Sequence, residues 1–218
     1  MFASNREIFF LGLLGFGAAV QAEFVALHVV EITENDLGLS EYALYAVFDD
    51  PGDEVLTVNT GSIATTTGFF HNTINGAGQS ALPFTSAMNA ISDHPDADSF
   101  LTVGLSTGDD NETALGPFFD LNAFLFGTMV DGFWFNANPT NDQGVAGLDG
   151  LVLLAVFTPL NDVAGMPGVV TGNVTIGYGN PAIPGAQFAT ASFITPAPGA
   201  LGLLALAGMI GRSRRRRC

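Results

Sequence analysis

Lysine is missing from this 218-residue chain, and every arginine lies close to one of its two ends. Arg6 stands near the start, and the other five arginines follow Gly211. Of the 21 acidic residues only Glu7 lies outside residues 23–211, so that stretch holds 20 acids and carries −20 with histidine neutral. Because lysine and arginine contacts to phosphate supply most nucleic-acid affinity, we expect no nucleic-acid partner.

Groups that carry catalysis are scarce as well. The single cysteine is Cys218, the last residue, so no intrachain disulfide can form. Residues 23–211 offer no lysine for a Schiff base, no thiolate nucleophile and no cation to clamp a phosphoryl group. Walker, G-x-S-x-G and H-E-x-x-H patterns are also absent from the sequence. We therefore expect a non-enzymatic protein. The 20 acids leave one alternative open, a glycan-cleaving enzyme with two carboxyls about 5–10 Å apart in a cleft.

Residues 1–22 have the parts of a secretory signal peptide. Arg6 supplies positive charge, and an apolar run extends from Ile8 to Val20. Val20 and Ala22 then place small or apolar residues at the −3 and −1 positions of a cleavage site. A buried N-terminal helix is the alternative, although glycines inside the run disfavour it. We expect the Sec-type export machinery to be a partner, with cleavage after Ala22.

The C-terminal residues 195–218 contain a proline-rich break, an apolar stretch and a basic end. Pro196, Ala197 and Pro198 come first, and an apolar run follows over residues 200–211. The run is shorter than the ~20 residues of a full span, but flanking residues and long arginine side chains can extend it. Clustered arginines stay on the cytoplasmic side, which places the acidic middle of the chain outside. The arginines of this membrane stop are Arg212, Arg214, Arg215, Arg216 and Arg217.

Residues 195–217 resemble a PEP-CTERM sorting domain, the tripartite C-terminal signal of many exported bacterial proteins. Proline motif, apolar helix and arginine run stand in the same order, and the chain departs from the pattern at Ala197, where an acidic residue is usual. The resemblance implies an exosortase-like processing enzyme and transient insertion in the inner membrane. It also implies delivery to the cell surface or extracellular matrix, where polysaccharide is a further partner. An ordinary tail anchor is the alternative.

Residues 23–194 are predicted to form one all-β domain. Short runs rich in Val, Ile, Phe, Tyr and Thr alternate with Gly, Pro, Asn and Asp, and no long apolar stripe has the helical period. This pattern favours an antiparallel β-sandwich or jelly roll, between an N-terminal signal helix and a short C-terminal transmembrane helix. The expected strands are Phe24–Thr33, Tyr42–Phe48, Val55–Thr60, Ser99–Leu105, Met129–Phe135, Leu151–Thr158, Val169–Ile176 and Ala186–Phe193, with short helices at Phe84–Ile91 and Leu121–Phe126.

Two of these strands carry clear patterns. Alternation predicts that Tyr42, Leu44, Ala46 and Phe48 share one face of their strand. The segment Leu151–Phe157 is apolar at every position, as expected for a strand that is covered on both faces.

Three acidic loops are candidates for a calcium site, because Ca²⁺ takes six to eight oxygen ligands. None matches the EF-hand pattern, and the alternative is ordinary solvated turns, in which Asp side chains accept backbone N–H groups. The three histidines, His28, His71 and His94, lack helical metal-binding spacing, and we expect ordinary structural roles for them. The candidate calcium ligands are Asp49, Asp50, Asp53, Asp96, Asp98, Asp109 and Asp110.

Trp134 is the only tryptophan and lies between two phenylalanines. If it is exposed on a sheet face it can stack on sugar rings, and the chain is then a carbohydrate-binding module, calcium-dependent if an acidic loop holds the ion. If it fills the core, as large aromatic side chains commonly do, this hypothesis loses its main support. The leading hypothesis is a structural or interaction protein directed to the cell surface or matrix. Exposure of Trp134 is the observation that separates the two.

Overall fold

The computed structural model describes residues 23–35, 37–180 and 183–195. The predicted signal peptide with its cleavage site at Ala22, the proline motif at 196–198 and the arginine cluster at 212–217 lie outside the described residues. Within the described ranges, no helix has both the length and the apolar character that crossing a membrane requires.

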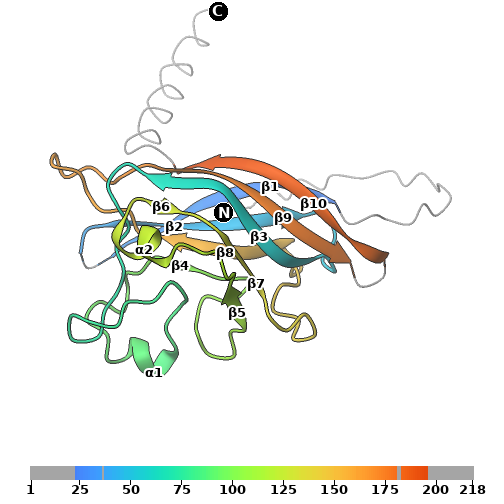
Figure 1. Ribbon diagram of the computed structural model, residues 1–218, viewed down its shortest axis with the longest axis horizontal. Helices are drawn as coiled ribbons and strands as arrows, with labels where there is room; N and C mark the ends of the chain where they lie inside the picture. The colour runs from blue at the N-terminus through green and yellow to red at the C-terminus, as the bar shows by residue number, and fades with distance from the viewer. Residues whose placement is uncertain (1–22, 36, 181–182, 196–218) are drawn as a thin grey trace, which may run out of the picture.

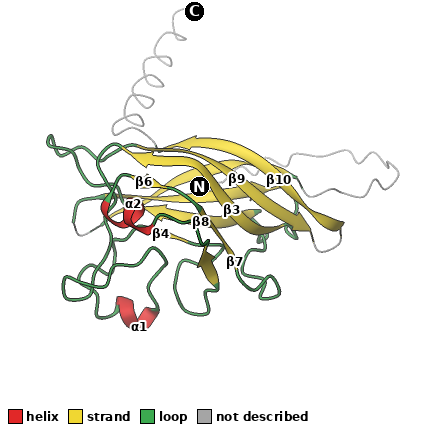
Figure 2. Cartoon of the chain, viewed as in Figure 1, coloured by secondary structure: helices red, strands yellow, loops and turns green. Residues whose placement is uncertain are grey.

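The described chain contains ten strands in two antiparallel sheets (Figures 1 and 2). One sheet has the strand order β1-β2-β8-β4, and the other has the order β10-β9-β3-β7-β5, with β6 paired to β3. Two short helices lie in the connections between strands. Because strands form both sheets and the helices are brief, the predicted all-β class is confirmed. The elements are β1 (Phe24–Glu34), β2 (Ser40–Phe48), β3 (Glu54–Thr65), α1 (Ser86–Asn89), β4 (Phe100–Leu101), β5 (Thr113–Leu115), α2 (Leu121–Phe126), β6 (Met129–Val130), β7 (Phe133–Asn136), β8 (Leu151–Phe157), β9 (Val170–Asn180) and β10 (Ile183–Ile194).

The main hydrophobic core lies between the two sheets. The predicted alternation on β2 is confirmed for Leu44, Ala46 and Phe48, which belong to this core, and Tyr42 is buried as well. Side chains of β3 and β9 meet this strand from the opposite sheet, and apolar burial of this kind contributes about 25 cal/mol for each Å² removed from water. The core members from β3 and β9 are Val55, Val58, Ile63, Val170, Val174, Ile176 and Tyr178.

Strand β8 is covered on both faces, as its unbroken apolar sequence predicts. Val152 and Leu154 point into the main core. Leu153 and Val156 belong to a second, smaller cluster on the other face of the same sheet, together with Phe100. Something must therefore cover the outer face of the four-stranded sheet, and the long connection between β3 and β5 does so.

Trp134 joins the two sheets through the core. It lies on β7 and is 0% exposed, and its indole Nε1 donates to the backbone oxygens of Thr102 at 2.9 Å and Leu154 at 3.2 Å. Because Leu154 belongs to β8, this side chain reaches from one sheet to the backbone of the other. The prediction of a sugar contact at Trp134 is wrong, since the alternation on β7 turns Trp134 inward and leaves Phe133 and Phe135 outward.

Some elements differ from the sequence expectation in length. The strand expected at Ser99–Leu105 is reduced to the two residues of β4. The strand expected at Met129–Phe135 is divided into β6 and β7, because Gly132 adopts a φ of +124° and interrupts the ladder. The helix expected at Phe84–Ile91 contains only the four residues of α1. β5 was not predicted, since three residues are too few for a periodic pattern.

A pair of glycine substitutions tests the packing of the loop that follows β4. Gly104 has a φ of +88°, and a Cβ atom there would lie 1.6 Å from the backbone oxygen of Gln143. Gly76 has a φ of +71°, but nothing lies within 4 Å of its Cβ position. We expect Gly76→Ala to cost about 1–2 kcal/mol of unfolding free energy through backbone strain alone. Gly104→Ala should cost more than about 4 kcal/mol or prevent folding.

Urea unfolding followed by the fluorescence of Trp134 measures both losses. Equal losses in the two variants would show that the close approach of Gly104 to Gln143 does not constrain the fold.

Candidate functional site

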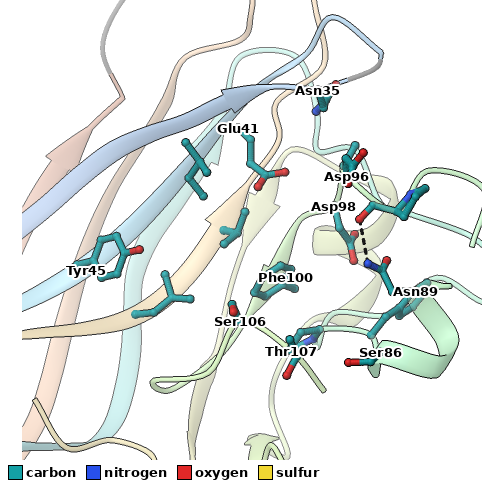
Figure 3. A pocket seen from close by; sticks show the side chains of 17 residues that line it. Asn35, Glu41, Tyr45, Ser86, Asn89, Asp96, Asp98, Phe100, Ser106 and Thr107 are labelled. Carbon is teal, nitrogen blue, oxygen red and sulfur yellow. Dashed lines mark hydrogen bonds between the residues drawn. The ribbon is translucent and has the colours of Figure 1, made fainter. Parts of the chain in front are cut away.

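A cleft of about 540 Å³ lies against the outer face of the four-stranded sheet. Its floor is formed by side chains of β2, β4 and β8, among them Tyr45, Phe100 and Val156. Its opposite wall comes from the connection that carries α1 and from residues 106–107 (Figure 3). The cleft thus exists because this connection covers the sheet without filling all of the space above it.

The cleft combines carboxyl groups with neutral donors and acceptors. Glu41 extends from β2 toward Asp96 and Asp98, which lie on the connection just before β4 (Figure 3). Two of these carboxyls were candidates from the sequence, whereas Glu41 was not. The polar neutral residues that line the cleft are Asn35, Ser86, Asn89, Ser106 and Thr107.

Thr158 connects Glu41 to Asp98. Its Oγ1 atom lies 2.7 Å from the backbone oxygen of Asp98 and 3.3 Å from Oε2 of Glu41. A hydroxyl group has one proton to donate, and the carbonyl oxygen can only accept. The hydroxyl can therefore donate to only one of these two oxygens at a time. Burial raises the pKa of Glu41, and the hydrogen bond from Thr158 opposes this rise.

Asp98 holds its proton at neutral pH. Its Oδ1 atom accepts the backbone N–H groups of Asn72 at 2.9 Å and Ser99 at 2.8 Å. These bonds favour the charged form, but burial outweighs them and raises the pKa of Asp98 to about 8, with a further contribution from the nearby Glu41. The inner end of the cleft therefore presents a neutral carboxyl group, which can both donate and accept hydrogen bonds.

His71 lies behind Asp98, on the side away from the cleft. Its Nδ1 atom is 3.9 Å from Oδ1 of Asp98, and its Nε2 atom is 3.1 Å from the backbone oxygen of Phe124. Because that oxygen can only accept, Nε2 must carry the proton. Burial lowers the pKa of His71, so the imidazole is neutral at pH 7. His71 and Asp98 are thus two neutral neighbours and do not form an ion pair.

The three acidic loops lie in separate places. At the β2–β3 turn Asp50 accepts the N–H of Gly52 at 3.0 Å, and Asp53 is fully buried and accepts from Asn180 Nδ2 at 2.9 Å. Burial raises the pKa of Asp53. Asp49 at the same turn is exposed.

The third loop contacts α1. Asp109 accepts both the backbone N–H and the hydroxyl of Ser86, which lowers its pKa, and Asp110 is exposed with a φ of +56°. Among the residues that the structure describes, no three His, Cys, Asp or Glu side chains are grouped so that they could hold a metal ion. Calcium binding therefore remains a prediction from the sequence alone.

The pH dependence of stability tests the protonation of Asp98. Its pKa in the folded protein, about 8, lies above the ordinary aspartate pKa of 3.8, so the folded state binds the proton more tightly. The resulting stabilisation is complete below pH ~4 and is lost as the pH rises through 8. His71 has the opposite effect, but only below its unfolded pKa of about 6.5. Between pH 6.5 and 8 we expect the unfolding free energy to fall by up to about 2 kcal/mol.

Asp98→Asn should remove most of this slope, because the amide keeps the acceptor oxygen and cannot ionise. Asp109→Asn is the matched control: the pKa of Asp109 is lowered, so this variant should keep the slope of the unsubstituted protein in this range. Thermal or urea unfolding at several pH values measures the slopes. Identical slopes for the two variants would mean that Asp98 is ionised in the folded protein.

Comparison of the chain with protein-family models, with curated proteins and with solved structures found no match.

Proposed function

We propose that this chain is an exported protein of the cell surface or extracellular matrix, and that its acidic β-sandwich binds a polysaccharide in the cleft between the four-stranded sheet and the α1 connection. Its role is binding and not catalysis. The observation that carries the proposal is the cleft itself, with protonated and ionisable carboxyls, amides and hydroxyls above an aromatic floor. Export rests on the sequence of the two ends, with Sec-type machinery and an exosortase-like enzyme as partners.

The lining of the cleft matches the chemistry of a sugar chain. Sugars present hydroxyl groups that donate and accept hydrogen bonds, next to apolar ring faces. Asp98 offers a donor and an acceptor atom, Glu41 adds acceptor oxygens, and Asn89 adds an amide. Tyr45 and Phe100 supply apolar surface beneath them. A concave, partly apolar site with a few convergent polar groups is the usual form of a small-ligand site.

Charge restricts which polysaccharide can bind. Residues 23–211 contain no lysine or arginine, and Asp96 adds a carboxyl at the rim of the cleft. A glycan rich in carboxylate or sulfate groups would meet repulsion and no counter-charge. We therefore expect the ligand to be a neutral polysaccharide, or one that carries amino groups.

Filling the cleft with a large side chain tests the binding site. Ser106 lines the cleft and is exposed, so Ser106→Trp should occupy the space without disturbing the core. We expect this variant to weaken binding to neutral and amine-bearing polysaccharides at least about tenfold, a loss of about 1.4 kcal/mol. Ala164→Trp, in an exposed loop outside the cleft, should bind as the unsubstituted protein does. Affinity electrophoresis or calorimetry measures the difference.

Two results would contradict this assignment. If both tryptophan variants bind equally well, the cleft is not the binding site. If the protein shortens the glycan, and Glu41→Gln stops the release of new reducing ends, the two carboxyls are catalytic and the chain is a glycan-cleaving enzyme.

Intact-mass analysis of protein recovered from the producing cells tests the export part of the proposal. We expect a mature chain that begins at Glu23 and ends near Pro196–Pro198, because both terminal signals are removed. A full-length chain of 218 residues found dissolved in the cytosol would show that the ends are not sorting signals.

A further inference from the structure

Exposed apolar side chains from three separate segments lie near the last described residue. Val163 and Met166 are in the loop between β8 and β9, Phe126 is at the end of α2, and Met129 is on β6. Ile194 closes β10. Phe126 and Ile194 are 74% and 64% exposed, which is unusual for side chains of this size in water. We call these five residues the apolar end.

Backbone pairing places these segments at the same end of the two sheets. A single row of strand partners runs from Ile194 through Thr171 and Ala64 to Met129. The loop that contains Val163 and Met166 is closed at its base, where Gly168 N–H donates to Leu160 O at 3.0 Å. The base lies beside this row, because Thr66 N–H donates to Val169 O at 3.1 Å. Figure 1 shows β6, α2 and the last residues of β10 at one end of the sheets.

The opposite end of the sheets has a different character. It contains the β2–β3 turn and the loop before β8, which are joined where Ala146 N–H donates to Asp53 O at 2.7 Å. Exposed acidic residues gather there. At the apolar end, Asp162 turns its carboxylate to the N–H groups of Ala164 at 2.8 Å and Met166 at 2.9 Å, and the exposed Asp120 and Asp131 lie beside α2 and β6. The exposed acids of the opposite end are Asp49, Asp142 and Asp149.

The position of the C-terminal sequence identifies what can cover the apolar end. The apolar run of residues 200–211 starts only five residues after Thr195. Five residues span at most about 18 Å, so the apolar end is held close to whatever surface takes up this run. If the run enters a bilayer, as the proposed function requires, the exposed side chains of the apolar end face the same bilayer.

We propose that the apolar end is a lipid-docking surface, and that it rests on the inner membrane while the C-terminal run is inserted. The proposal depends on the export route proposed above. Burial of apolar side chains at the boundary between headgroups and acyl chains drives the contact, as it does for other interfacial segments. With no lysine or arginine in the body, anionic lipids do not assist docking, and zwitterionic lipids are favoured. Docking turns the acidic end of the body away from the membrane.

Depth-dependent quenching tests the docking. The full chain with Cys218→Ser receives a single label, through either Val163→Cys or Leu148→Cys. These two apolar positions are equally exposed, at 109% and 100%, but Leu148 lies at the opposite end. Each labelled chain is reconstituted into phosphatidylcholine vesicles with brominated acyl chains. We expect the label at position 163 to lose roughly half or more of its fluorescence, because interfacial side chains enter about 5–10 Å. The label at position 148 should be unaffected.

A second variant and a flotation measurement separate the outcomes. Adding Phe126→Ser to the Val163→Cys chain should reduce quenching at position 163, and phosphatidylglycerol in the vesicles should reduce it further at low salt. If the chain floats with the vesicles but both labels stay equally bright, the docking proposal is wrong and tail insertion stands. If the chain does not float, insertion fails and docking fails with it. If unlabelled Val163→Cys chains form disulfide-linked dimers and the labelled chains show no quenching, the surface belongs to a second copy and lipid docking is overturned.

Discussion

A body without lysine or arginine leaves each carboxyl group three options: water, a hydrogen bond from a neutral donor, or a proton of its own. Asp93 and Asp109 show the second option, since hydrogen bonds from Thr73 and Ser86 lower their pKa. Asp98 shows the third, since burial raises its pKa to about 8, and burial raises the pKa of Glu41 as well. The protonated carboxyl of Asp98 is therefore a direct consequence of the missing cations.

The cleft also depends on how the core is built. Because β8 is apolar on both faces, the four-stranded sheet needs a cover on its outer side, and the connection that bears α1 supplies it. Trp134 holds the opposite sheet in place through its hydrogen bonds to the backbone at Thr102 and Leu154. The largest aromatic side chain thus has a structural role, and the cleft lies on the other side of the sheet that it contacts.

Much of the fold was predictable from local patterns. Alternation identified β2, an unbroken apolar run identified β8, and α2 was predicted with its observed bounds. The cleft was predictable only in part: the sequence indicates Asp96 and Asp98 as candidate metal ligands, and nothing in it singles out Glu41 or Thr158. Glu41 and Thr158 are 117 positions apart, so no local pattern joins them. The sequence held one indication. The unbroken apolar run of β8 predicts a cover on the outer face of its sheet, and Glu41 and Tyr45 lie on that face of the neighbouring strand β2.

The sequence by itself determined the charge distribution and the strand pattern, because both depend only on residue type and spacing. Tertiary structure decided which side chains meet: it turned Trp134 into the core, brought Glu41 to Asp98, and collected Phe126 and Ile194 at one end of the sheets. The physical reason is that burial and pKa depend on what packs against a strand face, and that partner comes from a distant part of the chain.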